Sequence, residues 1–431
     1  MLRPFALCLG ALVGLGACGG RSSLLSAQGG AAGGASGVAD AGANDVMNAT
    51  DVPVASDAGH LPYLAVALAT GDSHTCALLD DRKVKCWGRD DHGQLGYGDT
   101  RDRGGSPSDM GDALPTVDLG TGRTATQISA AYEATCAILD DGSVKCWGNP
   151  TQTGLPLING LPADEGASAP PFATGDRLSP LDFGGRKATH LAVAAFVACA
   201  SMEDETFWCW GAGTRHGNPE LEGQSTHGEV VALSADALGL VFALFEDGSV
   251  DDVMGHHNAS SLTESGRKAV AIGGALYNET CAIFDDGTSA CLPSSINPPP
   301  IPMGTVALGA EPNFGWCWLD AQGAVRCSGE DAYCPLSPGG SGGIGGTIQP
   351  AWCPTADGEM PLGQPALAIT SGGLSFSCAL LSDAGVKCWG ANGSLAASPW
   401  LGAEFGADWS SNSPDVDVPK AWPEIDLGTH R

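Results

Sequence analysis

The residues best suited to chemistry are cysteines, because twelve of the sixteen fall into six pairs with one spacing. In each pair the second cysteine follows the first by ten positions, as in the segment CAILDDGSVKCWG that begins at Cys136. Such thiols can oxidise to a disulfide or bind a metal ion. Zinc sites usually place two to four residues between neighbouring ligands and need four converging ligands. The spacing therefore favours disulfides over the zinc alternative. The six pairs are Cys76 and Cys86, Cys136 and Cys146, Cys199 and Cys209, Cys281 and Cys291, Cys317 and Cys327, and Cys378 and Cys388.

An Asp-Gly turn lies between the cysteines of the best copy, which predicts a β-hairpin. Folding the segment about Asp141 places Ile138 opposite Val144 and Cys136 opposite Cys146, with all four side chains on one face. Directly opposed residues of this kind have Cα atoms roughly 4.5 Å apart, which a disulfide can span. The spacing thus predicts a cross-strand bridge within each hairpin.

A seventh copy, the fourth along the chain, keeps the turn but has Phe242 and Asp252 at the two cysteine positions. The loss of both cysteines together is what a bonded pair predicts. Two of the other four cysteines, Cys334 and Cys353, lie in one insertion, where we expect them to pair. Cys8 and Cys18 belong to the N-terminal segment, so no free nucleophilic thiol is expected in the mature chain.

The N-terminus is typical of a secretory signal, with Arg3 followed by an apolar run from Phe5 to Leu15. The sequence Leu-Gly-Ala-Cys that ends at Cys18 resembles the lipobox of bacterial lipoproteins, and this resemblance implies that Cys18 is lipid-modified. The alternative is an ordinary cleaved signal with an incidental cysteine. We expect residues 1–18 to be the signal, and the Gly/Ala/Ser-rich residues 19–60 to be a disordered tether spanning roughly 35 Å.

The remaining residues, 61–431, hold the seven copies at an average spacing of about 53 residues, near that of propeller blades. Short alternating apolar runs and abundant glycine and proline predict an all-β fold. The formal net charge of −29 argues against nucleic acid and anionic lipid as partners of this domain, and we attribute it to solubility.

The segment from Gly71 to Arg103 resembles one repeat of the regulator of chromosome condensation family. The shared marks are His74-Thr75, Trp87-Gly88 and the run from Gly93 to Gly96. The resemblance covers residues 61–431 and implies a seven-bladed β-propeller. Ile425-Asp426-Leu427-Gly428 repeats the segment from Val117 to Gly120, which starts the next repeat. The family builds one blade from both termini, so the resemblance implies a ring closed by N- and C-terminal segments.

Nuclear members of that family bind chromatin and act as nucleotide exchange factors. The positions that do so are not recognisable in this sequence, and an exported acidic protein would not meet those partners. We therefore do not expect that activity here.

Other motifs with possible chemistry have simpler explanations. Gly339 to Gly343 matches the pattern of a nucleophile elbow but sits in a Gly-rich insertion, and His256-His257 point in different directions as neighbours. The Asp-Asp-Gly runs are explained as turns, and the recurring Trp87, Trp147, Trp210 and Trp389 as packing between blades. No catalytic, cofactor-binding or metal-ligating residue is predicted.

Function is expected in three insertions, residues 149–180, 328–364 and 391–424. Trp352, Trp400, Phe405 and Trp409 are candidate interface anchors, with packing onto the propeller as the alternative. The sequence thus predicts an exported monomeric scaffold, anchored by lipid at the outer membrane or cell surface, that binds a protein or glycan without catalysis or cofactor. Two alternatives remain: a glycan-acting enzyme with paired carboxylates at one mouth of the ring, and an inhibitor of a secreted enzyme.

Overall fold

The computed structural model describes residues 61–149, 173–194, 197–211, 221–224, 227–235, 239–254, 266–274, 280–292, 301–311, 315–328, 359–360, 362–372, 376–390 and 424–430. These residues form seven antiparallel sheets that follow one another along the chain. The predicted signal, tether and Cys18 lie outside the described residues, as do Cys334, Cys353, His256, His257 and Gly339 to Gly343.

Each sheet is one blade with an inner, a middle and an outer strand. The first two blades are β1 (Ala65–Thr70), β2 (His74–Leu79), β3 (Val84–Gly88) and β4 (Ala125–Ala131), β5 (Ala134–Leu139), β6 (Val144–Gly148). The third is β7 (Ala188–Val193), β8 (Ala198–Met202), β9 (Thr206–Trp210) and a fourth strand, β10 (Leu221–Gln224). The fourth and fifth are β11 (Val230–Ala235), β12 (Val241–Phe245), β13 (Val250–Asp252) and β14 (Ala269–Gly274), β15 (Thr280–Phe284), β16 (Ser289–Leu292). The last two are β17 (Thr305–Glu311), β18 (Gly315–Asp320), β19 (Val325–Ser328) and β20 (Ala366–Gly372), β21 (Phe376–Leu381), β22 (Val386–Gly390). The described parts of the connections contain three short 3-10 helices, η1 (Pro107–Asp109), η2 (Gly111–Ala113) and η3 (Gly175–Arg177).

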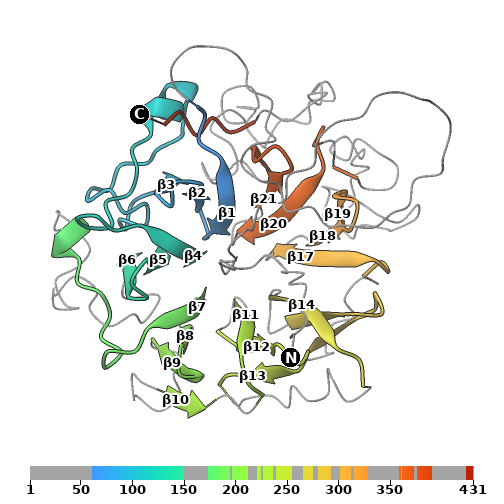
Figure 1. Ribbon diagram of the computed structural model, residues 1–431. Coiled ribbons are helices and arrows are strands. Elements are labelled where there is room, and N and C mark those ends of the chain that lie inside the picture. The colour runs from blue at the N-terminus through green and yellow to red at the C-terminus, as the bar shows by residue number, and fades with distance from the viewer. Residues whose placement is uncertain are drawn as a thin grey trace, which may run out of the picture.

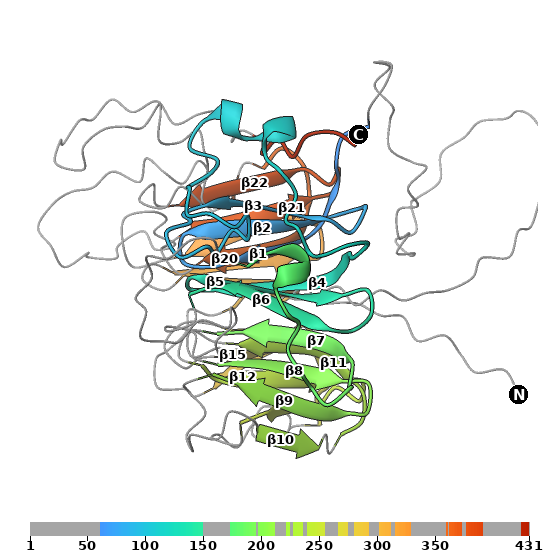
Figure 2. The ribbon, with the colours of Figure 1, turned by 90° about the vertical axis from the view of Figure 1, so that its left-hand side faces the viewer.

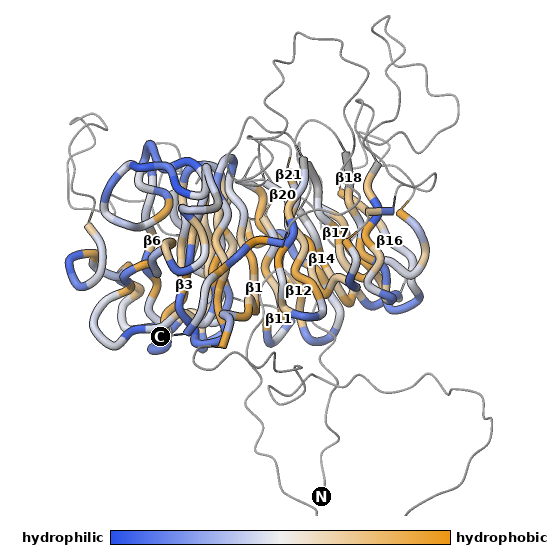
Figure 3. Tube along the Cα trace, turned by 90° about the horizontal axis from the view of Figure 1, so that it is seen from above, coloured by the Kyte–Doolittle hydropathy of each residue, from blue (hydrophilic) through white to orange (hydrophobic). Residues whose placement is uncertain are grey.

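The inner strands meet around a common centre, as Figure 1 shows. Every inner strand contacts the inner strands of both neighbouring blades, and β20 of the last blade contacts β1 of the first. Figure 2 shows the sheets side by side, and Figure 3 shows hydrophobic strands between hydrophilic turns. The predicted seven-bladed all-β propeller is confirmed.

The inner strands repeat a pattern that suits their convergence. Each has one leucine or isoleucine at the same register position, followed by a small residue. Small side chains let the strands approach near the axis. At Gly309, for example, a Cβ atom would lie 2.6 Å from the Oγ of Ser371 in the next blade. The aliphatic residues are Leu68, Ile128, Leu191, Leu233, Ile272, Leu308 and Ile369.

A tight turn connects the middle and outer strands of each blade, and in the second, fourth and fifth blades it is the predicted Asp-Gly turn. In the first, third and seventh blades a non-glycine residue with positive φ takes the place of the glycine: Arg82, Glu205 and Ala384. In the second blade Asp141 Oδ1 accepts a hydrogen bond from the backbone N–H of Ser143 at 3.0 Å. Gly142 has a φ of +80°, a conformation that side chains rarely adopt. This turn sets the register that places Cys136 directly opposite Cys146 and Ile138 opposite Val144.

Six disulfides lie within the described residues, one in each cysteine-bearing hairpin. Their Cα atoms are 3.9 to 4.1 Å apart, slightly closer than the expected spacing. In the fourth blade Phe242 stands opposite Asp252 in the same register. That hairpin therefore forms without a bridge.

The recurring tryptophans are buried as expected: Trp87, Trp147, Trp210 and Trp389 are at most 5 % exposed. The Trp147 indole N–H reaches the first blade, where it donates to the carbonyl oxygen of Gln94 at 3.0 Å. This tryptophan joins two blades in addition to filling the core.

The two ends of the described chain are hydrogen bonded to each other. The N–H of Tyr63 donates to Gly428 O, and that of His430 donates to Leu61 O, both at 2.8 Å. Ile425 N–H donates to Val386 O of the last blade at 2.8 Å. Lys85 Nζ of the first blade donates to Leu427 O at 2.7 Å. The C-terminal segment thus links the last blade to the first.

Antiparallel strand order gives the ring two distinct faces. The inner-to-middle turns and the ends of the outer strands share one face, which we call the insertion face. The middle-to-outer turns share the other, which we call the turn face. The strands β6, β19 and β22, which precede the three predicted insertions, all end at the insertion face.

Within the described residues, no helix has the length and apolar character that a membrane span requires.

Candidate functional site

The long connection between the first and second blades presses against the second blade. Asp90 is fully buried, and its Oδ1 accepts the backbone N–H of Leu95 at 2.9 Å. The Gln94 carbonyl accepts from Trp147 Nε1 and from Thr135 Oγ1, both at 3.0 Å. At Gly96, with φ +78°, a Cβ atom would lie 2.7 Å from the Trp147 indole nitrogen. The run from Gly93 to Gly96, which is part of the family resemblance, therefore fixes this loop of the first blade to the second blade. We call this contact the clamp.

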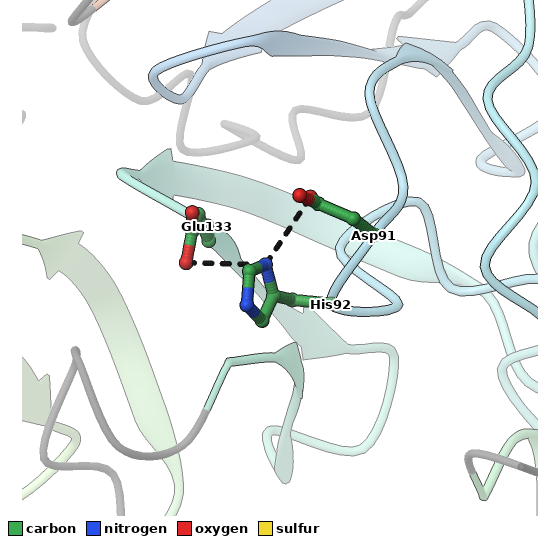
Figure 4. Close-up of side chains that lie close together, drawn as sticks. All are labelled: Asp91, His92 and Glu133. Carbon is green, nitrogen blue, oxygen red and sulfur yellow. Dashed lines mark hydrogen bonds and ion pairs between the residues drawn. The ribbon is translucent and has the colours of Figure 1, made fainter. Parts of the chain in front are cut away.

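The clamp places two polar residues of the first blade beside one of the second, as Figure 4 shows. His92 Nδ1 lies 3.1 Å from Asp91 Oδ1 and 3.3 Å from Glu133 Oε2. Asp91 and His92 come from the loop after β3, whereas Glu133 comes from the turn between β4 and β5. All three side chains are partly exposed at the insertion face. Among the described residues this is the one group of three or more His, Cys, Asp or Glu whose ligand atoms all lie within 4.8 Å of one another.

Neighbouring side chains orient both carboxylates. Arg89 pairs with Asp91 Oδ2 at 2.6 Å, and Gln94 Nε2 donates to Asp91 Oδ1 at 3.3 Å. Burial acts to raise the pKa of Asp91, but the contacts with Gln94, His92 and Arg89 outweigh it and the pKa falls below its usual value. Asn149 Nδ2 donates to Glu133 Oε2 at 2.7 Å. Asp91 is therefore ionised near neutral pH.

Asp72 is a second carboxyl group beside Glu133. The backbone N–H of Asp72 donates to Tyr132 O at 2.8 Å, so the inner-to-middle turns of the first two blades touch. Burial, followed by the charge of Glu133, raises the pKa of Asp72 to about 6. This carboxyl group can exchange a proton close to neutral pH.

His74, the histidine of the family resemblance, lies below this surface and is fully buried. Its Nε2 is 2.8 Å from Thr135 Oγ1, and its Nδ1 has no hydrogen-bond partner among the described residues. Burial lowers the pKa of His74 to about 3. The ring is thus neutral in the folded protein and helps to join the first two blades.

Because His74 is buried in its neutral form, we expect the free energy of unfolding to fall in acid. Because its folded pKa of about 3 is below the unfolded value of 6.5, the unfolded chain binds the proton first as pH falls. The stabilisation that neutral His74 provides is complete above pH 6.5. It is lost progressively as the pH falls from 6.5 to about 3. From pH 7 to pH 5 this group should cost about 2 kcal/mol of unfolding free energy.

Urea unfolding at pH 7, 6 and 5 measures this effect against His74→Gln, which cannot titrate. The difference in unfolding free energy between the two proteins should shrink by about 2 kcal/mol from pH 7 to pH 5. A difference that stays constant with pH would show that His74 titrates normally.

A cavity of about 130 Å³ lies on the ring axis. Its wall includes Thr70, Ser129, Ser234 and Thr370, with Thr70 Oγ1 and Thr370 Oγ1 2.8 Å apart. Ser129 Oγ also accepts the backbone N–H of Val193 at 3.1 Å. The hydroxyl groups of Thr70, Thr370 and Ser129 therefore join neighbouring inner strands around the axis.

The predicted interface residues Trp352, Trp400, Phe405 and Trp409 lie outside the described residues. Sequence reasoning did not select Asp91, His92 or Glu133. The pair Asp91-His92 follows a recurring Trp-Gly, but nothing in the sequence connects it with Glu133, forty-one positions further on. Only the packing of one blade on the next brings them together.

Comparison with known proteins agrees with the repeat architecture. A family model described as "Regulator of chromosome condensation (RCC1) repeat" matches residues 65–94 and 125–152. The ultraviolet-B receptor UVR8 of Arabidopsis thaliana is 34 % identical over 82 residues, which are 19 % of this chain and 17 % of UVR8. The chain thus spans less than a fifth of the length of this relative.

Two solved structures are similar at low sequence identity. The CRINKLY WD40 ectodomain of the Arabidopsis thaliana receptor kinase ACR4 is 17 % identical, with 77 % of this chain and 99 % of that chain covered and a TM-score of 0.46. Prp20p of Saccharomyces cerevisiae, studied for its binding to Gsp1p and histones, is 16 % identical, with 84 % and 77 % covered and a TM-score of 0.43.

Proposed function

Since the chain belongs to the regulator of chromosome condensation repeat family, we propose that it is a binding scaffold whose insertion face captures a protein or glycan at the cell surface. The supporting observation is the strand order, since β6, β19 and β22 all end at that face. The three insertions, which carry the candidate anchors Trp352, Trp400, Phe405 and Trp409, therefore start from one surface. Loops that leave a rigid scaffold together are a common way to build a binding site.

The position of Leu61 indicates how a tethered propeller would be oriented relative to the membrane. Leu61 O accepts from His430 N–H, and His430 Nε2 lies 3.1 Å from Asp80 Oδ2 in an Asp-Asp turn. The described chain therefore starts at the turn face. A tether over residues 19–60 that ends there would leave the insertion face directed away from the membrane.

The compartment is argued from the disulfides. Six cross-strand bridges are typical of an oxidising environment outside the cytosol. We propose export with lipid attachment at Cys18, so that the domain is held at the outer membrane or cell surface as a monomer.

Replacing Cys18 with Ala is expected to move the protein from the membrane fraction to the soluble fraction, because the lipid would be its only anchor. Fractionation and immunoblotting of the cells that produce the full chain measure this, with Cys8→Ala as the matched control. Retention of the Cys18→Ala protein in the membrane fraction would rule out the lipid anchor.

Affinity capture from the native cell surface, with the full chain as bait, tests the binding function. Replacement of residues 391–423 by a short Gly-Ser linker, or the double substitution Trp400→Ala and Trp409→Ala, should weaken partner binding at least tenfold. Glu246→Ala, an exposed substitution on the turn face, is the matched control and should leave binding unchanged. Equal binding by all three variants would refute the insertion face as the binding surface.

The same experiment separates the inhibitor from the simple scaffold. If the captured partner is a secreted enzyme whose activity falls on binding in proportion to occupancy, the protein is an inhibitor.

One observation favours the alternative of a glycan-acting enzyme. Asp72, with a pKa raised to about 6, and Glu133 lie on adjacent turns of one face, as an acid and a second carboxylate would. Release of reducing sugar from cell-surface glycans, abolished by both Asp72→Asn and Glu133→Gln, would support catalysis. Activity that survives both substitutions would exclude this pair.

A further inference from the structure

The ligand atoms of Asp91, His92 and Glu133 all lie within 4.8 Å of one another, and the two distances from the histidine match those between the ligands of a metal ion. A tetrahedral Zn²⁺ with ligands at about 2.0–2.1 Å holds neighbouring ligand atoms roughly 3.3 Å apart. His92 Nδ1 lies 3.1 Å from Asp91 Oδ1 and 3.3 Å from Glu133 Oε2. We propose that these three residues bind a divalent transition-metal ion of the Zn²⁺ type.

The ligand set suits this class of ion. Imidazole nitrogen and carboxylate oxygen are both zinc ligands, and a site with three protein ligands keeps a fourth position for water or another group. The three side chains are partly exposed, so an ion can reach them from solvent. Two carboxylates supply the charge that balances a divalent ion.

The site is held in place before any ion arrives. Asp91 and His92 lie on the clamped loop, where Gln94 Oε1 accepts the His92 backbone N–H at 2.8 Å. Gln94 Nε2 donates to Asp91 Oδ1, and Asn149 Nδ2 donates to Glu133 Oε2. Such outer partners orient metal ligands and raise affinity.

One neighbouring cation has to be accommodated. Arg89 pairs with Asp91 through Oδ2, whereas the oxygen nearest His92 is Oδ1. The guanidinium therefore occupies the carboxylate oxygen that the proposed coordination does not use. The competing explanation is a plain ion triad, in which a protonated His92 sits between the two carboxylates.

Isothermal titration of the metal-stripped full chain with ZnCl₂, and then with CoCl₂ for its visible absorption, distinguishes the two explanations. Zn²⁺ should bind with a stoichiometry of one ion at this site and raise the melting temperature. His92→Ala and Glu133→Gln should each weaken binding at least tenfold and remove the thermal shift. Asn149→Ala, which removes an outer partner, should weaken binding by about tenfold.

Two other histidines provide matched controls because they also contact carboxylates. His227 Nε2 lies 3.2 Å from Asp251 Oδ2, and His430 Nε2 lies 3.1 Å from Asp80 Oδ2. His227→Ala and His430→Ala should leave the affinity unchanged. No Zn²⁺ binding by the wild-type chain, or binding unaltered by His92→Ala and Glu133→Gln, would overturn the proposal and leave an ion triad. The metal site is independent of the proposed capture of a protein or glycan, so a negative result in affinity capture does not bear on it.

Discussion

Reduction of the hairpin disulfides is expected to unfold the propeller. Each of the six described bridges closes a loop of ten residues and contributes roughly 3 kcal/mol in the chain-entropy model. Even if these contributions add only in part, their loss approaches the ~5–15 kcal/mol that stabilises a typical domain. Tryptophan fluorescence and circular dichroism with and without reductant measure the effect. A native signal that persists after all thiols have become titratable would contradict it, and so would free hairpin thiols before reduction.

Removal of a single disulfide tests whether the bridges themselves are the source of this stability. Replacing Cys136 and Cys146 together with Ala should lower the unfolding free energy by about 3 kcal/mol. The unbridged fourth blade supplies the control, since Asp252 occupies the position of an outer-strand cysteine and is partly exposed. Asp252→Ala loses the hydrogen bond to Met254 N–H and should cost about 1 kcal/mol. Similar costs for both variants in urea unfolding would show that the bridges are not a major source of stability.

Deletion of residues 425–431 is expected to have the second large effect. Ile425 and Leu427 are 3 % and 5 % exposed, and loss of a buried aliphatic side chain costs about 2–5 kcal/mol. The deletion also removes the bonds to Leu61 and Tyr63 and one carbonyl partner of the buried Lys85. We expect at least ~5 kcal/mol of destabilisation, measured as the shift of the urea midpoint.

An internal repeat provides the matched control for this deletion. Leu119 is as buried as Leu427, and its carbonyl accepts Lys145 Nζ just as Leu427 O accepts Lys85 Nζ. Leu119→Ala and Leu427→Ala should therefore destabilise the protein equally. If the deletion costs no more than Leu119→Ala, the C-terminal segment does not hold the last blade to the first.

The local features of the blades could be predicted from short stretches of chain. Period-two alternation and an Asp-Gly turn determine which residues face each other, so the pairs Cys136 with Cys146 and Ile138 with Val144 follow from spacing alone. The alternating hairpin pattern recurs seven times, three of them with Asp-Gly at the turn, and this recurrence predicts the number of blades. The match between Ile425 to Gly428 and Val117 to Gly120, taken with the family resemblance, predicted that the N- and C-terminal segments meet, and the hydrogen bonds of Tyr63 with Gly428 and of His430 with Leu61 join them.

The candidate site depends instead on how one blade packs against the next. Asp91 and His92 meet Glu133 because Gln94 O binds Trp147 and Thr135 of the second blade, a contact that no local spacing encodes. The burial that moves the pKa of Asp72 and His74 away from ordinary values likewise arises between blades. Strand pairing within a hairpin is a short-range property that a sequence pattern carries. The meeting of side chains from separate hairpins is a long-range one, and in this protein only the closed packing of the ring specifies it.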